Sequence, residues 1–268
     1  MNTKKIKTIV RKEWAEVFKH RMVLFTVAFL PLIMTALPLI IIYSTNNNNQ
    51  GTENSLNTEV PSEVMGAMCD EGLNGPECFQ VFMVSEFMML FMILPMAIPG
   101  TIAAYSIVGE KTTRSLEPLL ATPITTAELL IGKCLAAVIP AVIATYGAFA
   151  VFAAGSWMMV KNKLLLEALL DVRWLIAIVI VGPLLAILEV TFALMVSSRV
   201  NDPRVAEQIS MVIILPILAG FFGQMAGWFI LDRQLILIVA LVMAVLDVLM
   251  FYLATQFFQR EAILTRWK

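Results

Sequence analysis

Three acidic residues, Glu86, Glu189 and Asp247, lie inside stretches of the sequence that are otherwise almost entirely apolar. An ionised carboxylate is costly there, so each acid should be neutral, face a watery pathway, or bind a cationic substrate or ion. Glu86 is close to the end of its stretch and is expected to reach water. Glu189 and Asp247 lie deeper, away from any Lys or Arg. They are the candidates for pathway groups, and a neutral acid bonded to a neighbouring helix is the simpler alternative.

Cysteines divide between a polar segment and an apolar one. Cys69 and Cys78 both lie in segment 44–81, which has six acidic residues and no Lys or Arg, whereas Cys134 lies in an apolar stretch. On the oxidising side of a membrane Cys69 and Cys78 could form a disulfide, and two free thiols are the alternative. With no Cys-x-x-Cys pair and a single histidine in the chain, we predict no metal site.

The chain has no motif for nucleotide hydrolysis. A phosphate-binding loop needs glycine, four residues, and then Gly-Lys followed by Ser or Thr, so that backbone amides and the lysine surround the phosphates. The only Gly-Lys, at Gly132 and Lys133, is followed by Cys134 and has Ala127 where the first glycine belongs. We therefore expect no ATPase site, no bound cofactor and no enzymatic activity of this chain alone.

Composition determines which elements position these groups. Of 268 residues, 59% are hydrophobic and 15% charged, and the mean hydropathy is +0.84. Too few charges remain to cover a soluble fold, which excludes a soluble enzyme, a nucleic-acid binder and a disulfide scaffold. An all-α integral membrane protein remains, because six apolar stretches are long enough to cross a bilayer as helices. They are residues 22–43, 82–108, 129–157, 174–198, 209–231 and 235–258.

The distribution of basic residues predicts the orientation of these spans. Segments on one side of the membrane hold 15 of the 19 Lys and Arg residues, and segments on the other side hold four. Basic residues gather in cytoplasmic segments. We therefore predict a multi-pass protein of the cell membrane with both termini in the cytoplasm, an outer loop over 44–81 and a cytoplasmic tail over 259–268. Whether the fifth span ends in a re-entrant outer helix stays open.

Residues 1–21 repeat apolar side chains at helical spacing among seven cations. This pattern predicts an amphipathic helix that lies in the membrane interface, with Trp14 among the lipid headgroups and Lys12 and Glu13 beside it. A basic flank that only sets the topology is the alternative.

Segment 109–133 is the most patterned part of the chain. Charged residues recur at helical spacing from Glu110 to Glu117, and Pro118 and Pro123 then interrupt the pattern. Thr125 and Glu128 have the spacing of a capping box, which predicts the start of the third span. A simple connection would need no such layout, so we expect a cytoplasmic partner to dock here.

The same segment resembles the signature stretch of ABC-2 type transporter permeases. The matching residues are Glu110, Ser-Leu-Glu-Pro-Leu-Leu over 115–120, Thr122-Pro123-Ile124, Glu128 and Gly132-Lys133. Lys12-Glu13 before Trp14 and the six spans also agree. Arg114-Ser115 stands where the family has Gly-Thr.

The resemblance implies a permease subunit of an exporter. This chain and a second permease, either another copy or a homologue, would form the pathway. Two cytoplasmic ABC ATPase subunits would bind ATP and Mg²⁺ and drive transport. Segment 109–128 would be the coupling loop, and residues 1–21 would be the elbow helix. The ATPase-coupling residues would be Glu110, Arg114, Glu117, Thr122 and Pro123.

Substrate identity stays open at this stage. A hydrophobic or amphipathic molecule, such as a lipid, drug or peptide, fits an apolar pathway. Extrusion of Na⁺ or another cation is the alternative and would give Glu189 and Asp247 a role. Less favoured are an ATP-independent carrier or channel, and an intramembrane enzyme, for which the chain lacks a recognisable catalytic set.

Overall fold

The computed structural model describes residues 3–17, 19, 21–47, 75–112, 125–229 and 231–257. These residues are helical almost throughout and include no strand. The elements, in chain order, are α1 (Thr3–Val17), α2 (Arg21–Asn47), α4 (Gly75–Phe91), α5 (Leu94–Thr112), α7 (Thr126–Met159), α8 (Lys163–Leu169), α9 (Val172–Ile176), the π-helical segment η1 (Ala177–Val181), α10 (Gly182–Arg199), α11 (Pro203–Ser210), the 3₁₀ segment η2 (Met211–Ile214), α12 (Leu215–Met225) and α13 (Arg233–Phe257).

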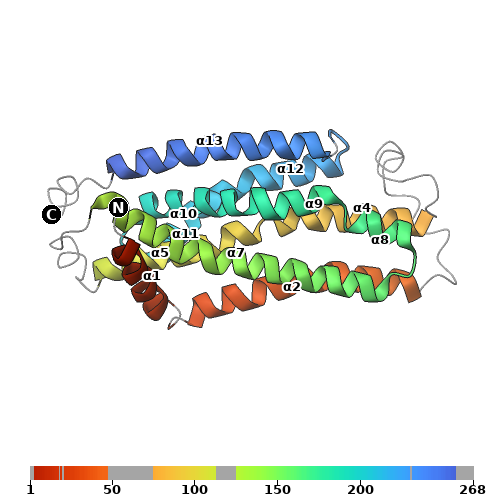
Figure 1. Cartoon of the computed structure of the whole chain (residues 1–268), viewed down its shortest axis with the longest axis horizontal. Coiled ribbons are helices and arrows are strands. Elements are labelled where there is room, and N and C mark those ends of the chain that lie inside the picture. Colours follow the sequence, from red (N-terminus) through yellow and green to blue (C-terminus); the bar gives the residue numbers. More distant parts are fainter. Residues whose placement is uncertain are drawn as a thin grey trace.

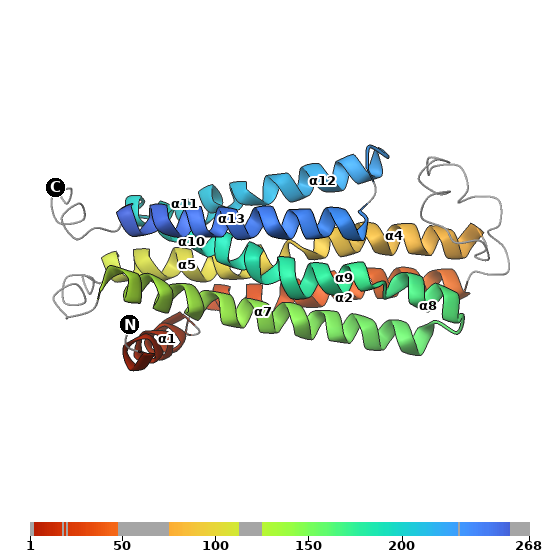
Figure 2. The same ribbon diagram turned by 45° about the horizontal axis from the view of Figure 1, so that its top comes forward.

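Six helical segments in the described part of the chain are long and apolar enough to cross a membrane. They run side by side along the long axis of the molecule (Figures 1 and 2). Their bounds are Val23–Asn46, Glu77–Glu110, Thr126–Met159, Lys163–Arg199, Pro203–Met225 and Arg233–Gln256. The predicted all-α fold with six membrane-crossing helices is confirmed.

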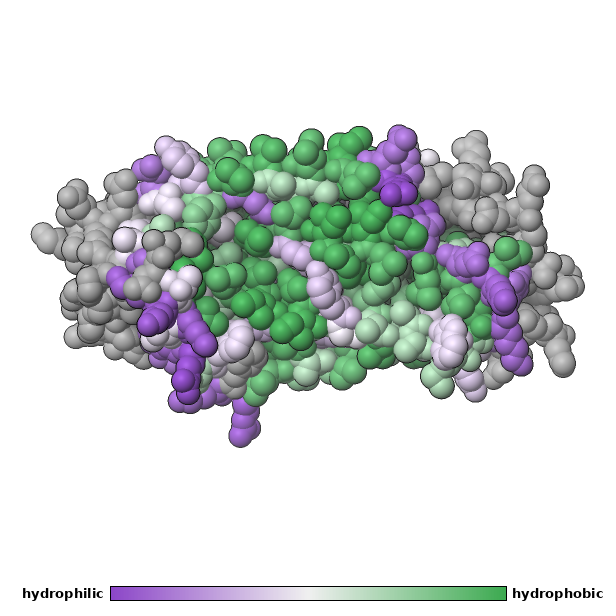
Figure 3. Space-filling view, in the orientation of Figure 1, coloured by the Kyte–Doolittle hydropathy of each residue, from purple (hydrophilic) through white to green (hydrophobic). Residues whose placement is uncertain are grey.

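On the face seen in Figure 3, apolar side chains cover the middle of the bundle, and polar side chains lie toward its two ends. On α13, Leu241 is 70% exposed and Val248 72% exposed. So much exposed aliphatic surface is unfavourable in water and favourable in lipid. The second span is the most enclosed by its neighbours, whereas the fifth and sixth are mostly uncovered.

Helix α1 and the last turn of α13 lie at the same end of the bundle, called here the α1 end; α8 lies at the other (Figure 1). The apolar core of the α8 half includes the buried rings of Phe91, Phe152 and Trp174. Around Ile98, Ala137 and their neighbours the core of the α1 half consists mostly of alanine and valine. Smaller side chains let these helices approach one another closely.

Helix α1 crosses the bundle instead of running along it (Figure 1). It buries Ile6 and Ile9 and leaves most of its other side chains exposed or half-buried. A Cβ atom on Gly132 would lie 2.8 Å from Cγ2 of Ile9. Glycine at this position therefore allows α1 to pack against α7.

The fifth span ends earlier than its apolar stretch. Helix α12 stops at Met225, and Gly227 adopts a positive φ of 73°, which glycine accommodates without strain. The chain then folds back and brings the Phe229 ring against Gly223. A Cβ on Gly223 would lie only 2.8 Å from that ring. Within the described residues this return is a turn, with no additional helix before α13.

Candidate functional site

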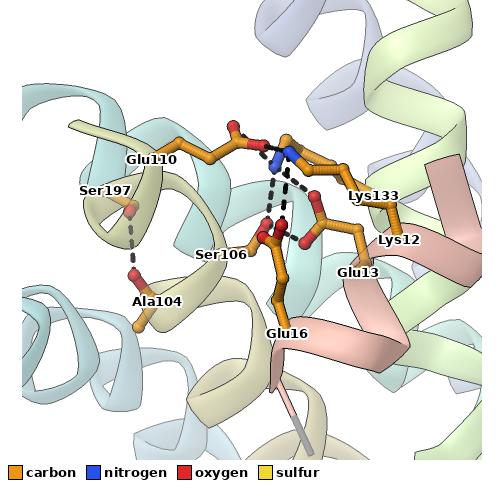
Figure 4. Close-up of polar contacts among 8 residues, drawn as sticks. All are labelled: Lys12, Glu13, Glu16, Ala104, Ser106, Glu110, Lys133 and Ser197. Atoms are coloured by element: carbon orange, nitrogen blue, oxygen red, sulfur yellow. Dashed lines mark hydrogen bonds and ion pairs between the residues drawn. The ribbon is translucent and has the colours of Figure 1, made fainter. Parts of the chain in front are cut away.

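Four buried side chains form an ionic cluster at the α1 end, called here the Lys133 cluster: Glu13, Ser106, Glu110 and Lys133 (Figure 4). The Lys133 ammonium donates to Glu13 Oε1 at 2.7 Å and to Ser106 Oγ at 2.7 Å. It also lies 2.9 Å from Glu110 Oε2. Ser106 in turn donates to Glu13 Oε2 at 2.6 Å. One ammonium group thus joins three helices, α1, α5 and α7.

Lys12 lies at the edge of the cluster and supplies its second positive charge. Its ammonium donates to Glu110 Oε1 at 2.7 Å and lies 3.9 Å from Glu16. Burial by itself lowers the pKa of Lys12, but the hydrogen bond and charge of Glu110 outweigh it, so this pKa stands above its ordinary value. Two ammonium groups therefore face the buried carboxylates of Glu13 and Glu110, which is the pairing that buried charges require.

Helix α1 is attached to both helices that flank residues 113–124. On the α5 side, Glu13 accepts from Ser106. On the α7 side, the indole of Trp14 donates to the carbonyl of Ala136 at 2.8 Å, and Lys5 lies 3.8 Å from Glu128. The helix therefore bridges the two sides of this connection.

The capping box predicted at the start of the third span is confirmed. Thr125 precedes α7, and its hydroxyl accepts from the Glu128 amide at 3.2 Å. The Glu128 carboxylate accepts from the Thr125 amide at 3.2 Å. Because the box satisfies amides that the first helical turn leaves free, it determines where α7 begins.

The acids Glu189 and Asp247 lie on α10 and α13, where they are 1% and 7% exposed. One oxygen of Glu189 and both oxygens of Asp247 have no hydrogen-bond partner among the described residues. No described Lys or Arg forms an ion pair with either acid. Glu189 packs against the backbone of α5, since a Cβ on Gly100 would lie 2.6 Å from its Oε1.

The expectation that Glu86 reaches water is wrong. Its side chain is only 4% exposed. The sequence position near a helix end suggested exposure, but α4 packs against α12 there, and Gln224 of α12 donates to the neighbouring Ser85. Glu86 is therefore buried, as Glu189 and Asp247 are.

Comparison with protein families decides the identity of the chain. The sequence model of the family described as "ABC-2 family transporter protein" matches residues 7–235, from α1 to the start of α13. The chain belongs to the ABC-2 transporter family. Comparison with curated proteins returns no match. The protein is thus a multi-pass membrane permease of an ABC transporter, a family of transport components generally without a catalytic site of their own and, in general, partnered by ABC ATPase subunits.

Of the five residues of this ABC-2 permease that are expected to contact an ATPase, Glu110 alone lies among the described residues. Arg114, Glu117, Thr122 and Pro123 lie outside the described residues. Glu110 is in the last turns of α5 and is only 2% exposed, so its carboxylate faces the Lys133 cluster instead of the surface. The structure therefore places Glu110 where it holds the base of the connection.

Sequence reasoning identified Lys12, Glu13 and Trp14 on α1, and the structure brings the first two together with Glu110. It missed Lys133 and Ser106. The signal for Lys133 is its place beside Cys134 in an apolar helix, where a lysine requires a buried partner. Ser106 has no distinguishing local signal.

The three cysteines of the permease differ in state. Cys134 is a free, buried thiol, and Cys78 is buried near the start of α4 and disulfide-bonded. Cys69 lies outside the described residues, so its pairing with Cys78 stays a prediction. Among the described residues no group of His, Cys, Asp and Glu is arranged to hold a metal ion.

Proposed function

We propose that this permease forms half of an export pathway, that a second copy or a homologue forms the other half, and that two separate ATPase subunits dock on segment 109–128. The observation that carries the proposal is the Lys133 cluster. It joins the two helices flanking this segment to each other and to α1, directly at the base of the expected docking loop.

The physical argument is one of stiffness. Removing one partner from a buried, hydrogen-bonded ion pair costs about 3–5 kcal/mol, so the pairs around Lys133 resist separation. A force applied by an ATPase to the segment between α5 and α7 would therefore displace α1, α5 and α7 together. A loop joined to flexible helix ends would lose that force in local bending.

Orientation and substrate follow from the same proposal. Both termini and the docking segment would lie in the cytoplasm, with α1 in the inner membrane interface as the elbow helix. Its exposed Lys7 and Arg11 would face anionic headgroups. The partner ATPase would hold ATP and Mg²⁺. The apolar spans favour a hydrophobic or amphipathic substrate, such as a lipid, drug or peptide, moved outward.

The test is purification of the tagged full-length chain from its own cell membranes in mild detergent. We expect an ABC ATPase to co-purify and the complex to hydrolyse ATP, whereas the pure chain alone does not. Glu117→Ala together with Pro123→Ala should release the ATPase, and Lys163→Ala on the exposed surface of α8 should not. Transport by the chain without any ATPase would contradict the proposal and favour an ATP-independent carrier.

Cation extrusion is the second candidate, and the buried acids favour it. Within the described part of the chain, Glu189 and Asp247 have oxygens without a hydrogen-bond partner and no counter-ion, a state that a transported cation would relieve. In the reconstituted complex, Na⁺-stimulated ATP hydrolysis should then fall at least about tenfold with Glu189→Gln or Asp247→Asn. Glu167→Gln, on the exposed face of α8, is the matched control. Unchanged rates in both pathway variants would exclude this candidate.

A further inference from the structure

The second and fifth spans are each interrupted near their middle. Helix α4 ends at Phe91, and the amides of Met92 and Ile93 bond only three residues back, at 3.1 and 2.9 Å. Pro95 follows, which has no amide hydrogen to donate. In the fifth span, the 3₁₀ segment η2 separates α11 from α12, and Pro216 follows it. Both spans therefore consist of two helices with an irregular join.

The halves of the two spans pair with each other. Near the α1 end, Thr101 of α5 donates to Glu207 of α11 at 2.8 Å. In the α8 half, Gln224 of α12 donates to Ser85 of α4 at 3.4 Å. Each half of the fifth span is thus bonded to the corresponding half of the second.

These contacts follow a single antiparallel register. Met89 lies four residues after Ser85 on α4, and Gly220 lies four residues before Gln224 on α12. These two residues are in contact, since a Cβ on Gly220 would lie 2.6 Å from the Met89 Cε. Continuing this register past the two joins leads to the contact between Thr101 and Glu207, and it places Pro95 level with η2. The two interruptions therefore lie at the same depth in the bundle.

The fourth span is irregular at this level too. Its π-helical segment η1 ends at Val181, and a Cβ on the next residue, Gly182, would lie 3.9 Å from the Pro95 ring. Segments of π-helix and 3₁₀-helix and proline breaks replace the regular ladder of hydrogen bonds, and they are where helices bend. Three neighbouring spans thus share one layer of deformable backbone.

We propose that the second and fifth spans share one hinge at this layer, about which the pair α5–α11 turns against the pair α4–α12. Thr101 and Glu207 hold the first pair together. Ser106 and Glu110, on the opposite side of α5 from Thr101, belong to the Lys133 cluster, so displacement of the cluster moves α5 and, with it, α11. This last link rests on the proposed docking of an ATPase on segment 109–128; the hinge itself does not.

Hydrogen–deuterium exchange of the full-length chain in lipid nanodiscs tests the hinge without any ATPase. Backbone amides at 92–94 and 211–215 should exchange faster than those around Pro140, which lies in the uninterrupted helix α7. Pro95→Ala restores a donor and should slow exchange at 92–94. If the two joins form one hinge, it should also slow exchange at 211–215, by about threefold to tenfold, the range expected for one regained hydrogen bond.

Two variants separate a shared hinge from two independent breaks. Pro140→Ala, the matched control, should leave exchange at 211–215 unchanged. In a Thr101→Val background, Pro95→Ala should slow exchange only within the second span, because the bond to Glu207 is absent. Equal protection at the joins and around Pro140, or an effect of Pro95→Ala confined to its own span, would overturn the hinge. An unchanged effect in the Thr101→Val background would overturn the role of this bond.

The hinge and the proposed function can be refuted independently of each other. A chain that hinges as described but binds no ATPase would refute the proposed function alone. A complex that hydrolyses ATP while both joins stay as protected as α7 would refute the hinge alone.

Discussion

Lys133 and Glu13 are 120 residues apart in the chain, yet the ammonium of one lies 2.7 Å from the carboxylate of the other, and both side chains are buried. This contact ties the first helix of the protein to the beginning of the third span. Because Glu110 and Ser106 of the second span share the same ammonium, three separate segments meet at one atom.

Lys133→Met should destabilise the protein more than any substitution of an exposed lysine. It leaves the Glu13 and Glu110 carboxylates buried with only Lys12 nearby, which should lower the free energy of unfolding by about 3–5 kcal/mol. Thermal unfolding in detergent measures the effect. Lys163→Met is the exposed control and should change stability by less than about 0.5 kcal/mol. Equal behaviour of the two variants would show that the cluster contributes nothing to stability.

Glu13→Gln should weaken communication between α1 and the docking segment. The substitution keeps the shape of the side chain but removes its charge and leaves a weaker, neutral acceptor for Lys133, a change worth about 1–2 kcal/mol. We expect ATP hydrolysis by the permease–ATPase complex to fall several-fold. Glu16→Gln, which removes a carboxylate that is 53% exposed, should leave the rate unchanged. A rate that responds equally to both substitutions would argue against a specific role for Glu13.

The pair of Lys12 and Glu110 predicts a loss of stability at high pH. Folding raises the pKa of Lys12 above its ordinary value of 10.5. A raised pKa means that the folded state holds this proton more tightly, so the stabilisation is complete below pH 10.5 and is lost as the pH rises through the folded-state pKa. Stability measured across this range should fall more steeply in the wild type than in Lys12→Met. Parallel curves would show that Lys12 does not contribute.

Gly100→Ala should be destabilising because of Glu189. The new methyl group would lie 2.6 Å from Glu189 Oε1, so the buried carboxylate or helix α5 must shift, at a cost of about 1–3 kcal/mol. Gly147→Ala in α7 has no atom within 4 Å of the new methyl group and should stabilise its helix by about 0.5–1 kcal/mol. Unfolding of both variants, with Gly100→Ala also tested in a Glu189→Ala background that makes room, measures the difference. A Gly100→Ala variant as stable as the wild type would place Glu189 elsewhere.

Local features of the chain were predictable because local rules govern them. The six spans follow from runs of apolar residues long enough for a bilayer, and the start of α7 follows from Thr125 and Glu128, three residues apart. The burial of Glu86 was not predictable. Its position near a helix end suggested water, and only the packing of α12 against α4 removes it from solvent.

The sequence by itself determined that this is a six-span membrane protein of the ABC-2 type, since hydropathy and a short motif depend on neighbouring residues alone. Tertiary structure alone decided that Lys133 joins α1, α5 and α7, and that the second and fifth spans break at the same depth. Both depend on how distant helices pack. Hydropathy requires that apolar faces be buried, but many helix arrangements satisfy it, and only the actual packing selects which polar groups meet.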